Sequence, residues 1–275
     1  MKRKWTWMLV AAALALAGAA TAALARQGRE LDTSFRSISL RGPVHALVVV
    51  PPGYDEGTTR YPVVYFLHGL PATATTYRSN RWIEQVLARV GPAILVEPQG
   101  ARRGDSDAEY LDWGAGRNWE SYVSRELPNY IDAHFRTIRS RGGRALVGLS
   151  AGGFGATLLA LDHLDRFSVV ESWSGYFHPT DPTGTRPLDR GPRVDVHRLI
   201  ADLHADQQRR PTFFAFYVGR GDTRFRAENE LLHRELTAAH VPHVFDVYGG
   251  AHDTDLWRAH AAVWLRLAMA HLQRP

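Results

Sequence analysis

The chain has 275 residues, 45% of them hydrophobic, so it is long enough for one large domain with a sizeable core. Its formal net charge of +5 arises at the N-terminus, because residues 1–26 hold four basic and no acidic residues and their removal leaves +1. A nearly neutral domain excludes nucleic acid as a partner. The absence of cysteine excludes a disulfide framework and a lipid-attachment cysteine.

The N-terminal segment, residues 1–26, has the composition of an export signal. A basic start, Lys2–Lys4, precedes an apolar run, Trp5–Ala25, that ends in small-x-small patterns suited to signal peptidase. The run is also long enough to span a bilayer as an uncleaved anchor. Both alternatives predict an exported domain, residues 27–275, that is secreted or held at the cell envelope or membrane by its N-terminus.

From Ser39 onward, short apolar runs alternate with longer segments of helical period. This pattern predicts a single α/β domain with a mostly parallel, doubly wound sheet and helices on both faces. Runs bounded mostly by Gly, Pro or charged residues predict the strands Ala46–Val50, Val63–Leu67, Ala93–Val96, Ala145–Val147, Ser168–Ser172, Phe213–Val218 and His243–Val247.

Two segments have clear helical periodicity. Apolar residues recur at three- and four-residue steps over Trp119–Phe135, where Pro128 interrupts the pattern and is expected to kink the helix. The same spacing predicts a last helix over Thr254–Leu272, which we expect to close the far edge of the sheet.

Two irregular stretches, 100–118 and 174–211, are predicted as loops, the second with a short helical piece at Val194–His204. Acidic side chains in the first loop lack the EF-hand spacing, so we expect a solvated loop and no metal there: Asp105, Asp107, Glu109 and Asp112. Aromatic residues near both loops are candidates either for an apolar substrate pocket or for packing: Trp113, Trp119, Tyr176 and Phe177.

The sharpest local motif is Gly148-Leu149-Ser150-Ala151-Gly152. A predicted strand precedes it and a small-residue helix start follows, which is the setting of a nucleophilic serine on a tight turn. A Gly/Ser-rich loop that merely packs a helix on a sheet is the structural alternative. The motif predicts Ser150 as a nucleophile.

A serine hydroxyl needs a base and an acid that orients the base. We predict His252 as the base, because it lies on a loop between the last strand and the last helix. Asp222 follows the strand Phe213–Val218 and is the predicted acid, with a helix cap or turn as its structural alternative. Other acids are set aside as solvated on a helix, within a strand or too near His252: Glu228, Glu230, Asp246, Asp253 and Asp255.

Acyl transfer also needs hydrogen-bond donors for the oxyanion that develops. The backbone N–H groups of Ala151 and Leu70 are the predicted donors, since Leu70 ends the tight turn His68-Gly69-Leu70 after a strand. His68 itself is expected to be structural.

Four motifs together resemble the Putative esterase family of α/β-hydrolases: Tyr65-Phe66-Leu67-His68-Gly69, Asn118–Tyr122 running to Glu126-Leu127-Pro128, Gly148–Gly153, and Gly250–Asp253 with Trp257. The resemblance covers about residues 40–270. That family groups esterase D, feruloyl and acetylxylan esterases, enterochelin esterases and mycobacterial mycolyltransferases. It implies the α/β-hydrolase fold and a metal-free, cofactor-free Ser-acid-His hydrolase. It also supports Ser150, Asp222 and His252, with Leu70 and Ala151 as oxyanion donors.

Departures from the family narrow the prediction. Pro71–Thr75 lacks the acidic, Trp-containing stretch by which mycolyltransferases hold trehalose, and no cysteine matches the usual pattern of formylglutathione hydrolases. The leading hypothesis is a serine carboxylesterase acting on a small-molecule, lipid or carbohydrate ester. An acyltransferase with a sugar or lipid alcohol acceptor and a noncatalytic binding protein are the alternatives. The acyl and alcohol parts of the substrate and the oligomeric state are not predicted.

Overall fold

The computed structural model describes residues 28–105, 109–179, 194–200 and 203–275. The predicted export signal or anchor, residues 1–26, lies outside these ranges, as does Asp107 of the acidic loop. Within the described ranges, no helix has the length and apolar composition needed to cross a membrane.

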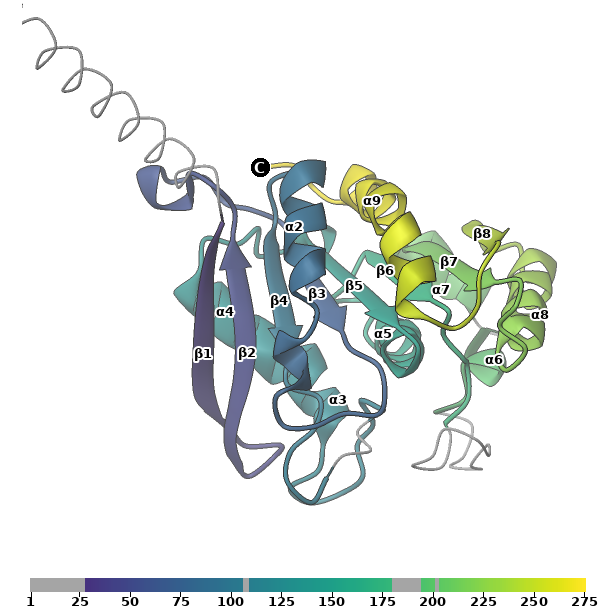
Figure 1. Ribbon diagram of the computed structural model, residues 1–275, viewed down its shortest axis with the longest axis horizontal. Helices are drawn as coiled ribbons and strands as arrows, with labels where there is room; N and C mark the ends of the chain where they lie inside the picture. The colour runs from purple at the N-terminus through teal and green to yellow at the C-terminus, as the bar shows by residue number, and fades with distance from the viewer. Residues whose placement is uncertain (1–27, 106–108, 180–193, 201–202) are drawn as a thin grey trace, which may run out of the picture.

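The described residues form one eight-stranded sheet in the order β1-β2-β4-β3-β5-β6-β7-β8 (Figure 1). The strands are β1 (Arg29–Ser37), β2 (Gly42–Val50), β3 (Val63–Leu67), β4 (Ile94–Pro98), β5 (Arg144–Leu149), β6 (Val169–Trp173), β7 (Phe213–Gly219) and β8 (His243–Tyr248). Neighbours from β4 to β8 are parallel, whereas β1, β2 and β4 pair antiparallel.

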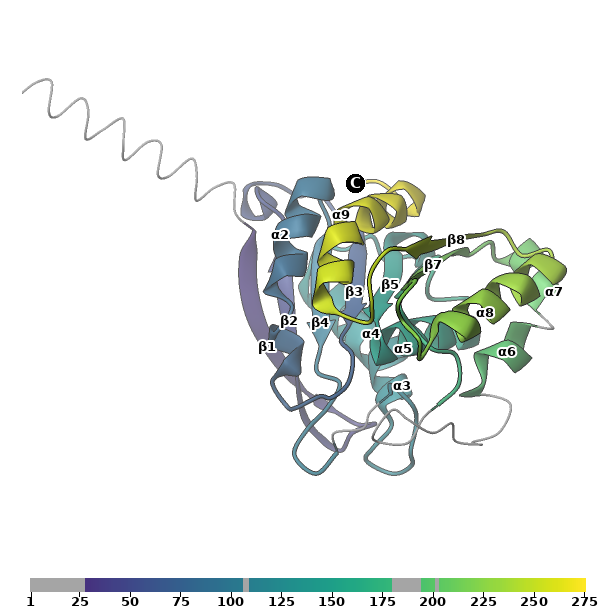
Figure 2. The ribbon, with the colours of Figure 1, turned by 45° about the vertical axis from the view of Figure 1, so that its right-hand side comes forward.

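Helices cover both faces of the sheet (Figure 2). On one face, α2 (Arg81–Val90) and α9 (Thr254–His271) pack against each other. The opposite layer contains α3 (Trp119–Ser121), the π-helical turn η3 (Tyr122–Glu126), α4 (Leu127–His134), α5 (Ala151–Asp162), α6 (Val196–Leu199), α7 (Leu203–Arg209) and α8 (Arg226–Ala238). Short 3₁₀ turns lie at Tyr54–Glu56, Thr76–Arg78 and Arg141–Gly143. This arrangement confirms the predicted α/β-hydrolase fold class.

The order of the strands reverses at β3, which has β4 on one side and β5 on the other. The chain leaves β3 toward the α2 face and leaves β5 toward the α5 face. Loops that depart to opposite faces open a crevice at the carboxyl ends of the two strands. Leu70 follows β3 and Ser150 follows β5, so both residues border this crevice.

All seven predicted strands are present, but β1 was not predicted. In β1 the partly buried side chains Leu31, Thr33 and Phe35 alternate with exposed, mostly charged ones. Only two of the three are apolar, so the period-two signal is weak in the sequence. The strand is held by a long antiparallel pairing with β2, which extends from Gly42 to Val50 and so begins earlier than predicted.

The helix predicted over Trp119–Phe135 is present but is not uniform. It widens into η3 directly before Pro128, and the N–H of Leu127 bonds to the carbonyl of Tyr122. Proline lacks the N–H that would bond four residues back, and its ring displaces that carbonyl, which accounts for a wider turn at this point.

The prediction that the last helix closes the far edge of the sheet is wrong. The edge is β8, and α9 instead packs on the sheet face beside α2 and over β6. The reason is the apolar side of α9, where Trp264 lies 4.8 Å from the ring of Tyr217 and Leu256 joins the same core cluster.

Glu97 of β4 is buried in the layer under α2. Its side chain belongs to a residue only 1% exposed, and neither carboxylate oxygen has a hydrogen-bond partner in the described part of the chain. Burial, together with the nearby carboxylates of Glu84 and Glu30, raises the pKa of Glu97 well above its usual range. The folded protein therefore holds Glu97 protonated where the unfolded chain ionises it.

We expect Glu97→Gln to stabilise the protein above about pH 5. Between the ordinary glutamate pKa of about 4.3 and the raised folded pKa, the folded state binds more protons, so stability falls as pH rises. The amide cannot ionise, so its melting temperature at pH 8 should exceed the wild-type value by about 2–4 °C, the shift that roughly 1 kcal/mol produces in a domain of this size. Thermal unfolding at several pH values measures this, with the surface variant Glu230→Gln as control. Equal pH slopes for wild type and Glu97→Gln would contradict it.

Candidate active site

Ser150 occupies a strained turn between β5 and α5. Its φ of 54° and ψ of −122° lie outside the regions that L-residues ordinarily adopt. It stands immediately before the first residue of α5, and the residue is 8% exposed. A serine in such a strand-to-helix turn has the backbone setting of a nucleophile elbow.

Glycine is required on both sides of this turn because the backbones approach too closely for a side chain. A Cβ added to Gly148 would lie 2.1 Å from the carbonyl oxygen of Gly152. A Cβ on Gly152 would lie 2.0 Å from the carbonyl oxygen of Leu67 in β3. Contacts this short do not occur with real side chains, so the two glycines let α5 seat against β3 and β5.

The structure brings Ser150, His252 and Asp222 into one hydrogen-bonded chain. His252 lies after β8, and its Nε2 is 2.9 Å from Ser150 Oγ. Its Nδ1 is 2.7 Å from Asp222 Oδ2, on the loop after β7. With the imidazole proton on Nδ1 and donated to Asp222, Nε2 accepts the hydroxyl proton of Ser150. The arrangement can activate the hydroxyl for nucleophilic attack.

Asp222 is held by its own loop and is fully buried at its side chain. Its Oδ1 accepts the backbone N–H groups of Arg224, at 3.3 Å, and Phe225, at 3.2 Å. Asp222 therefore does stabilise a turn, the alternative considered from the sequence. It uses one carboxylate oxygen for the turn, and the other contacts His252.

Two aromatic rings restrict the imidazole of His252. The rings of Phe225 and Trp257 approach it edge to face, with centroids 5.0 Å and 5.2 Å away. Sequence reasoning assigned neither residue this position. The sequence pointed to Trp257 only as part of the family motif around His252. For Phe225 it offered only the position three residues after Asp222.

The loop after β3 passes directly against the nucleophile. A Cβ added to Gly69 would lie 3.0 Å from the Cβ of Ser150, which is tight, so this position favours glycine. Leu70 is the residue after this contact. Ala151 is the first residue of α5, and its N–H has no partner within the helix. Ala151 thus directly follows the serine and Leu70 directly follows its glycine neighbour, and the role of their N–H groups as oxyanion donors stays a prediction.

His68 holds this loop and is structural, as expected. Its Nδ1 is 3.0 Å from the carbonyl oxygen of Gly69, and its Nε2 accepts the N–H of Gly100 at 3.1 Å. Burial lowers the pKa of His68 to about 4, so the ring is neutral at ordinary pH. The hydroxyl of Tyr110 donates to the carbonyl of His68 at 2.9 Å and fixes the same turn from the other side.

For two of the four aromatic candidates, Trp119 and Phe177, the structure shows the packing role that the sequence left open beside the substrate pocket. Trp119 is fully buried, and its Nε1 donates to Asp105 Oδ2 at 2.9 Å. Phe177 is also fully buried, with its ring 6.0 Å from that of Phe216. Both are packing residues because the loops that carry them fold into the core.

The other two aromatic candidates remain predictions. Tyr176 stacks on Phe154 at 5.3 Å and lies 5.0 Å from Phe225, the ring that contacts His252. It is thus close to the catalytic ring, although only 2% exposed. Trp113 is half-buried, with the guanidinium of Arg117 over its ring.

Two acidic residues of the loop, Asp105 and Glu109, are buried, contrary to the expectation of a solvated loop, whereas Asp112 is exposed as expected. Asp105 is 5% exposed and accepts from both Trp119 Nε1 and the Arg117 guanidinium, the latter at 2.6 Å. Glu109 is 1% exposed and accepts the hydroxyl of Tyr176. These carboxylates are buried because partners from other parts of the chain satisfy them.

Glu228 of α8 is partly buried and is not solvated as predicted. Its Oε1 accepts the backbone N–H of Phe177 at 3.0 Å, and its side chain is 13% exposed. By contrast Glu230 pairs with Arg226 near the surface.

Comparison with models of protein families assigns most of the chain to one family. The family model described as Putative esterase matches residues 37–265, which is most of the chain. In sequence, the chain is 33% identical over 129 residues to an esterase of Mycobacterium tuberculosis, covering 46% of this chain and 28% of that protein. It is 27% identical over 160 residues to the mouse S-formylglutathione hydrolase, covering 52% and 55%. The matched parts thus cover 28% and 55% of the length of these two relatives.

Solved structures share the fold. A ferulic acid esterase superposes with a TM-score of 0.76 at 24% identity, covering 90% of this chain and all of that one. An S-formylglutathione hydrolase from Agrobacterium tumefaciens gives a TM-score of 0.73 at 21% identity, covering 90% and 96%.

We expect Asp222→Asn to slow covalent labelling of Ser150 by a fluorophosphonate by about 10³–10⁴-fold. The amide keeps an acceptor for the loop N–H groups but no longer fixes the imidazole tautomer that leaves Nε2 free to accept a proton. Labelling rates measured by gel fluorescence test this. The matched control is Asp253→Asn, next to His252, where the side chain caps α9 by accepting the N–H of Leu256. Two outcomes would contradict the assignment: a loss of labelling in the control Asp253→Asn, or an unchanged labelling rate in Asp222→Asn.

Proposed function

The chain belongs to the Putative esterase family of α/β-hydrolases, and we propose that it hydrolyses carboxylic esters through an acyl-enzyme intermediate on Ser150. The observation that carries the proposal is the continuous hydrogen-bonded chain Ser150–His252–Asp222 at the crevice beside β3. A family relationship alone supports a class of chemistry, and this geometry supports a nucleophile, a base and an orienting acid for it.

In the proposed first half-reaction, Ser150 Oγ attacks the ester carbonyl carbon while His252 Nε2 takes the hydroxyl proton. The negative charge that develops on the carbonyl oxygen is stabilised by the N–H groups of Leu70 and Ala151, and a single donor of this kind contributes about 10²–10³ in rate. Asp222 stabilises the imidazolium without taking its proton. His252 then gives the proton to the leaving alkoxide, and the ester bond breaks.

In the second half-reaction, water replaces the alcohol. His252 Nε2 takes a proton from the water as its oxygen attacks the acyl carbon, and the same proton returns to Ser150 Oγ when the acyl–oxygen bond breaks. The free carboxylic acid leaves the crevice. An alcohol in place of water would give acyl transfer by the same steps, so adding candidate sugar and lipid alcohols to the assay separates transfer from hydrolysis.

We propose a small-molecule ester with an apolar acyl part as the substrate. Tyr176 and Phe225 form an aromatic contact immediately beside the ring of His252, which supports an apolar wall on that side. The structural similarity to a ferulic acid esterase supports the same class of substrate.

We expect Ser150→Ala to abolish hydrolysis of p-nitrophenyl acetate and butyrate, with kcat/KM falling by at least about 10³-fold, because no other group replaces the nucleophile. Release of p-nitrophenol by the purified wild-type protein and the variant measures this. Ser79→Ala, at an exposed serine of the turn directly before α2, serves as the control and should hydrolyse like wild type. Folded wild-type protein that neither turns over esters nor reacts with fluorophosphonate would overturn the proposal and favour a binding role.

We also propose that the domain is exported through residues 1–26, on the basis of the basic start, apolar run and small residues of that segment. Expression with a C-terminal tag in a bacterial host, followed by fractionation and intact-mass measurement, should find the protein outside the cytoplasm and shortened near Ala22 or Ala25. Full-length protein in the membrane fraction would indicate the uncleaved anchor, and full-length protein in the cytoplasm would refute export.

A further inference from the structure

Three side chains that are far apart in the sequence converge beside α8. His178 follows β6, His197 lies in α6, and Glu228 lies in the first turn of α8. One nitrogen of each imidazole and one carboxylate oxygen all lie within 4.8 Å of one another. His197 Nε2 is 3.5 Å from Glu228 Oε1, and His178 Nδ1 contacts the same oxygen. The side chains are 29%, 16% and 13% exposed, so the cluster is shielded but reachable.

The donor set and spacing fit a divalent transition metal. Imidazole nitrogens and a carboxylate oxygen are the ligands of three-protein-ligand zinc sites, which keep a fourth position for water. Ligands at about 2.0–2.1 Å from a tetrahedral ion are about 3.4 Å apart, close to the separation of His197 Nε2 and Glu228 Oε1. The His178 nitrogen belongs to the same group of ligand atoms, all within 4.8 Å of one another.

A second carboxylate already orients one ligand. Glu235, on the same helix as Glu228, lies with Oε2 2.6 Å from His197 Nδ1. A proton donated from Nδ1 to Glu235 leaves the Nε2 lone pair directed at the cluster. Carboxylate–histidine pairs of this kind support the ligands of known metal sites and raise their basicity. The local charge also favours a cation, because the carboxylates of Glu228 and Glu235 contact the two imidazoles, while Asp195 pairs with Arg198.

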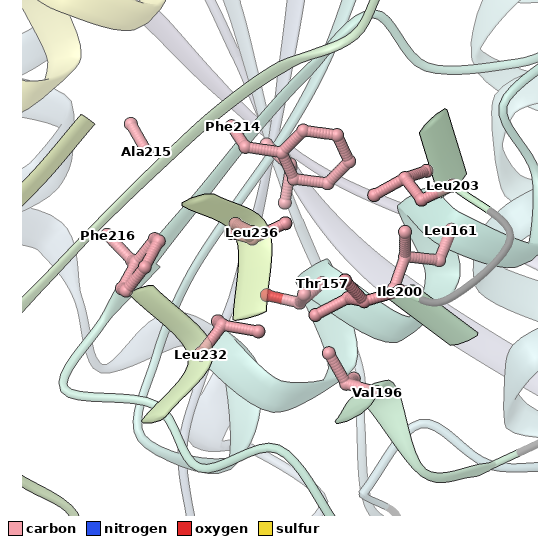
Figure 3. Close-up of a pocket in the computed structure, with 11 residues that line it drawn as sticks. Thr157, Leu161, Val196, Ile200, Leu203, Phe214, Ala215, Phe216, Leu232 and Leu236 are labelled. Carbon is pink, nitrogen blue, oxygen red and sulfur yellow. The ribbon is translucent and has the colours of Figure 1, made fainter. Parts of the chain in front are cut away.

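The two helices that carry His197 and Glu228 line one packed apolar layer. Val196 of α6, adjacent to His197, faces Leu232 of α8, one turn from Glu228, across a packed apolar layer (Figure 3). The space between the lining side chains is about 10 Å³, which is at the lower limit for a single water molecule. The layer is therefore too small to be a ligand cavity, and it brings α6 and α8 together beside His197 and Glu228.

We propose that His178, His197 and Glu228 bind one divalent transition-metal ion, for which the donor set favours Zn²⁺, and that the ion ties the chain after β6 and helix α6 to helix α8. This site goes beyond the proposed hydrolase chemistry, since none of its residues belongs to the Ser150–His252–Asp222 chain. Its effect on the fold is local: Phe177, next to His178, donates its N–H to Glu228, and α8 begins directly after the loop of Asp222.

A proton is the competing occupant of the cluster. The hydrogen bond to Glu228 raises the pKa of His178. For His197, burial acts to lower the pKa, but the hydrogen bonds to Glu228 and Glu235 outweigh it and the pKa is raised. A cluster that holds only protons contributes stability below the ordinary histidine pKa of about 6.5 and loses it as pH rises through the raised values. The two occupants therefore have opposite effects on stability above pH 7. Stabilisation by protons is lost there, whereas stabilisation by zinc increases because deprotonated imidazoles bind zinc better.

The test uses the full-length protein stripped with a chelator and dialysed at pH 7.5. We expect Zn²⁺ at about one hundred times its dissociation constant to raise the melting temperature by roughly 5–10 °C. Calorimetric titration should give one ion per chain, and Co²⁺ should give the intense visible bands of a tetrahedral site. His197→Gln and Glu228→Gln should each lose the cobalt bands. The apparent affinity for Zn²⁺, obtained from the thermal shift, should fall at least about 10-fold in each. Circular dichroism establishes that both variants remain folded.

A second histidine pair in the described chain provides the matched control. His233 of α8 lies with Nδ1 2.8 Å from His243 Nε2, near the surface and with no carboxylate in the pair. His233→Gln should leave the zinc shift and the cobalt bands unchanged. The proposal is overturned if the wild-type protein binds neither metal, if His233→Gln removes the signal instead, or if stability only declines between pH 6 and 8 and Zn²⁺ does not restore it.

Discussion

The fold depends on the close approach of α5 to β3 and β5 at Ser150. Gly148 and Gly152 leave no room for a Cβ, so the helix seats directly on the strands and the serine is forced to a positive φ. That one contact fixes the Ala151 amide beside the end of β3, where Gly69 touches the serine. The parallel neighbours β7 and β8 then deliver Asp222 and His252 to the same edge of the sheet.

The sequence allowed the strands and Ser150, His252 and Asp222 to be predicted because each follows a strand that is apolar over several residues. The carboxyl ends of parallel strands share one edge of the sheet. Residues that directly follow such strands were therefore expected to lie close together in space. The burial of charged residues could not be predicted in this way. Asp105 and Glu228 were expected in water, yet Asp105 is buried and Glu228 is partly buried by partners that no local pattern reveals. Strand β1 was missed for a related reason, since pairing with β2 rather than its own apolar content holds it.

Carboxylates shielded from solvent have different numbers of hydrogen-bond partners on the two faces of the sheet. On the α5–α8 face, Asp105 and Glu228 accept several hydrogen bonds. On the α2–α9 face, Glu97 has no hydrogen-bond partner among the described residues, and Glu171 accepts from Trp173 Nε1 at 3.1 Å while burial raises its pKa well above the usual range. Well-paired carboxylates organise the loops around the crevice, whereas Glu97 and Glu171 are best accommodated as neutral acids within a closed apolar layer.

The position of β8 has a consequence for how the protein loses activity. Ser150 stands on central strands whose residues are buried, whereas His252 follows an edge strand whose residues are half-exposed. Strands with few covered neighbours open at a lower free energy than the interior of a sheet. Ser150 and His252, the proposed nucleophile and base, therefore belong to regions of unequal local stability. Partial opening at the β8 edge separates these two side chains while the rest of the sheet stays folded, so we expect the proposed activity to be lost at lower temperature or denaturant concentration than the fold.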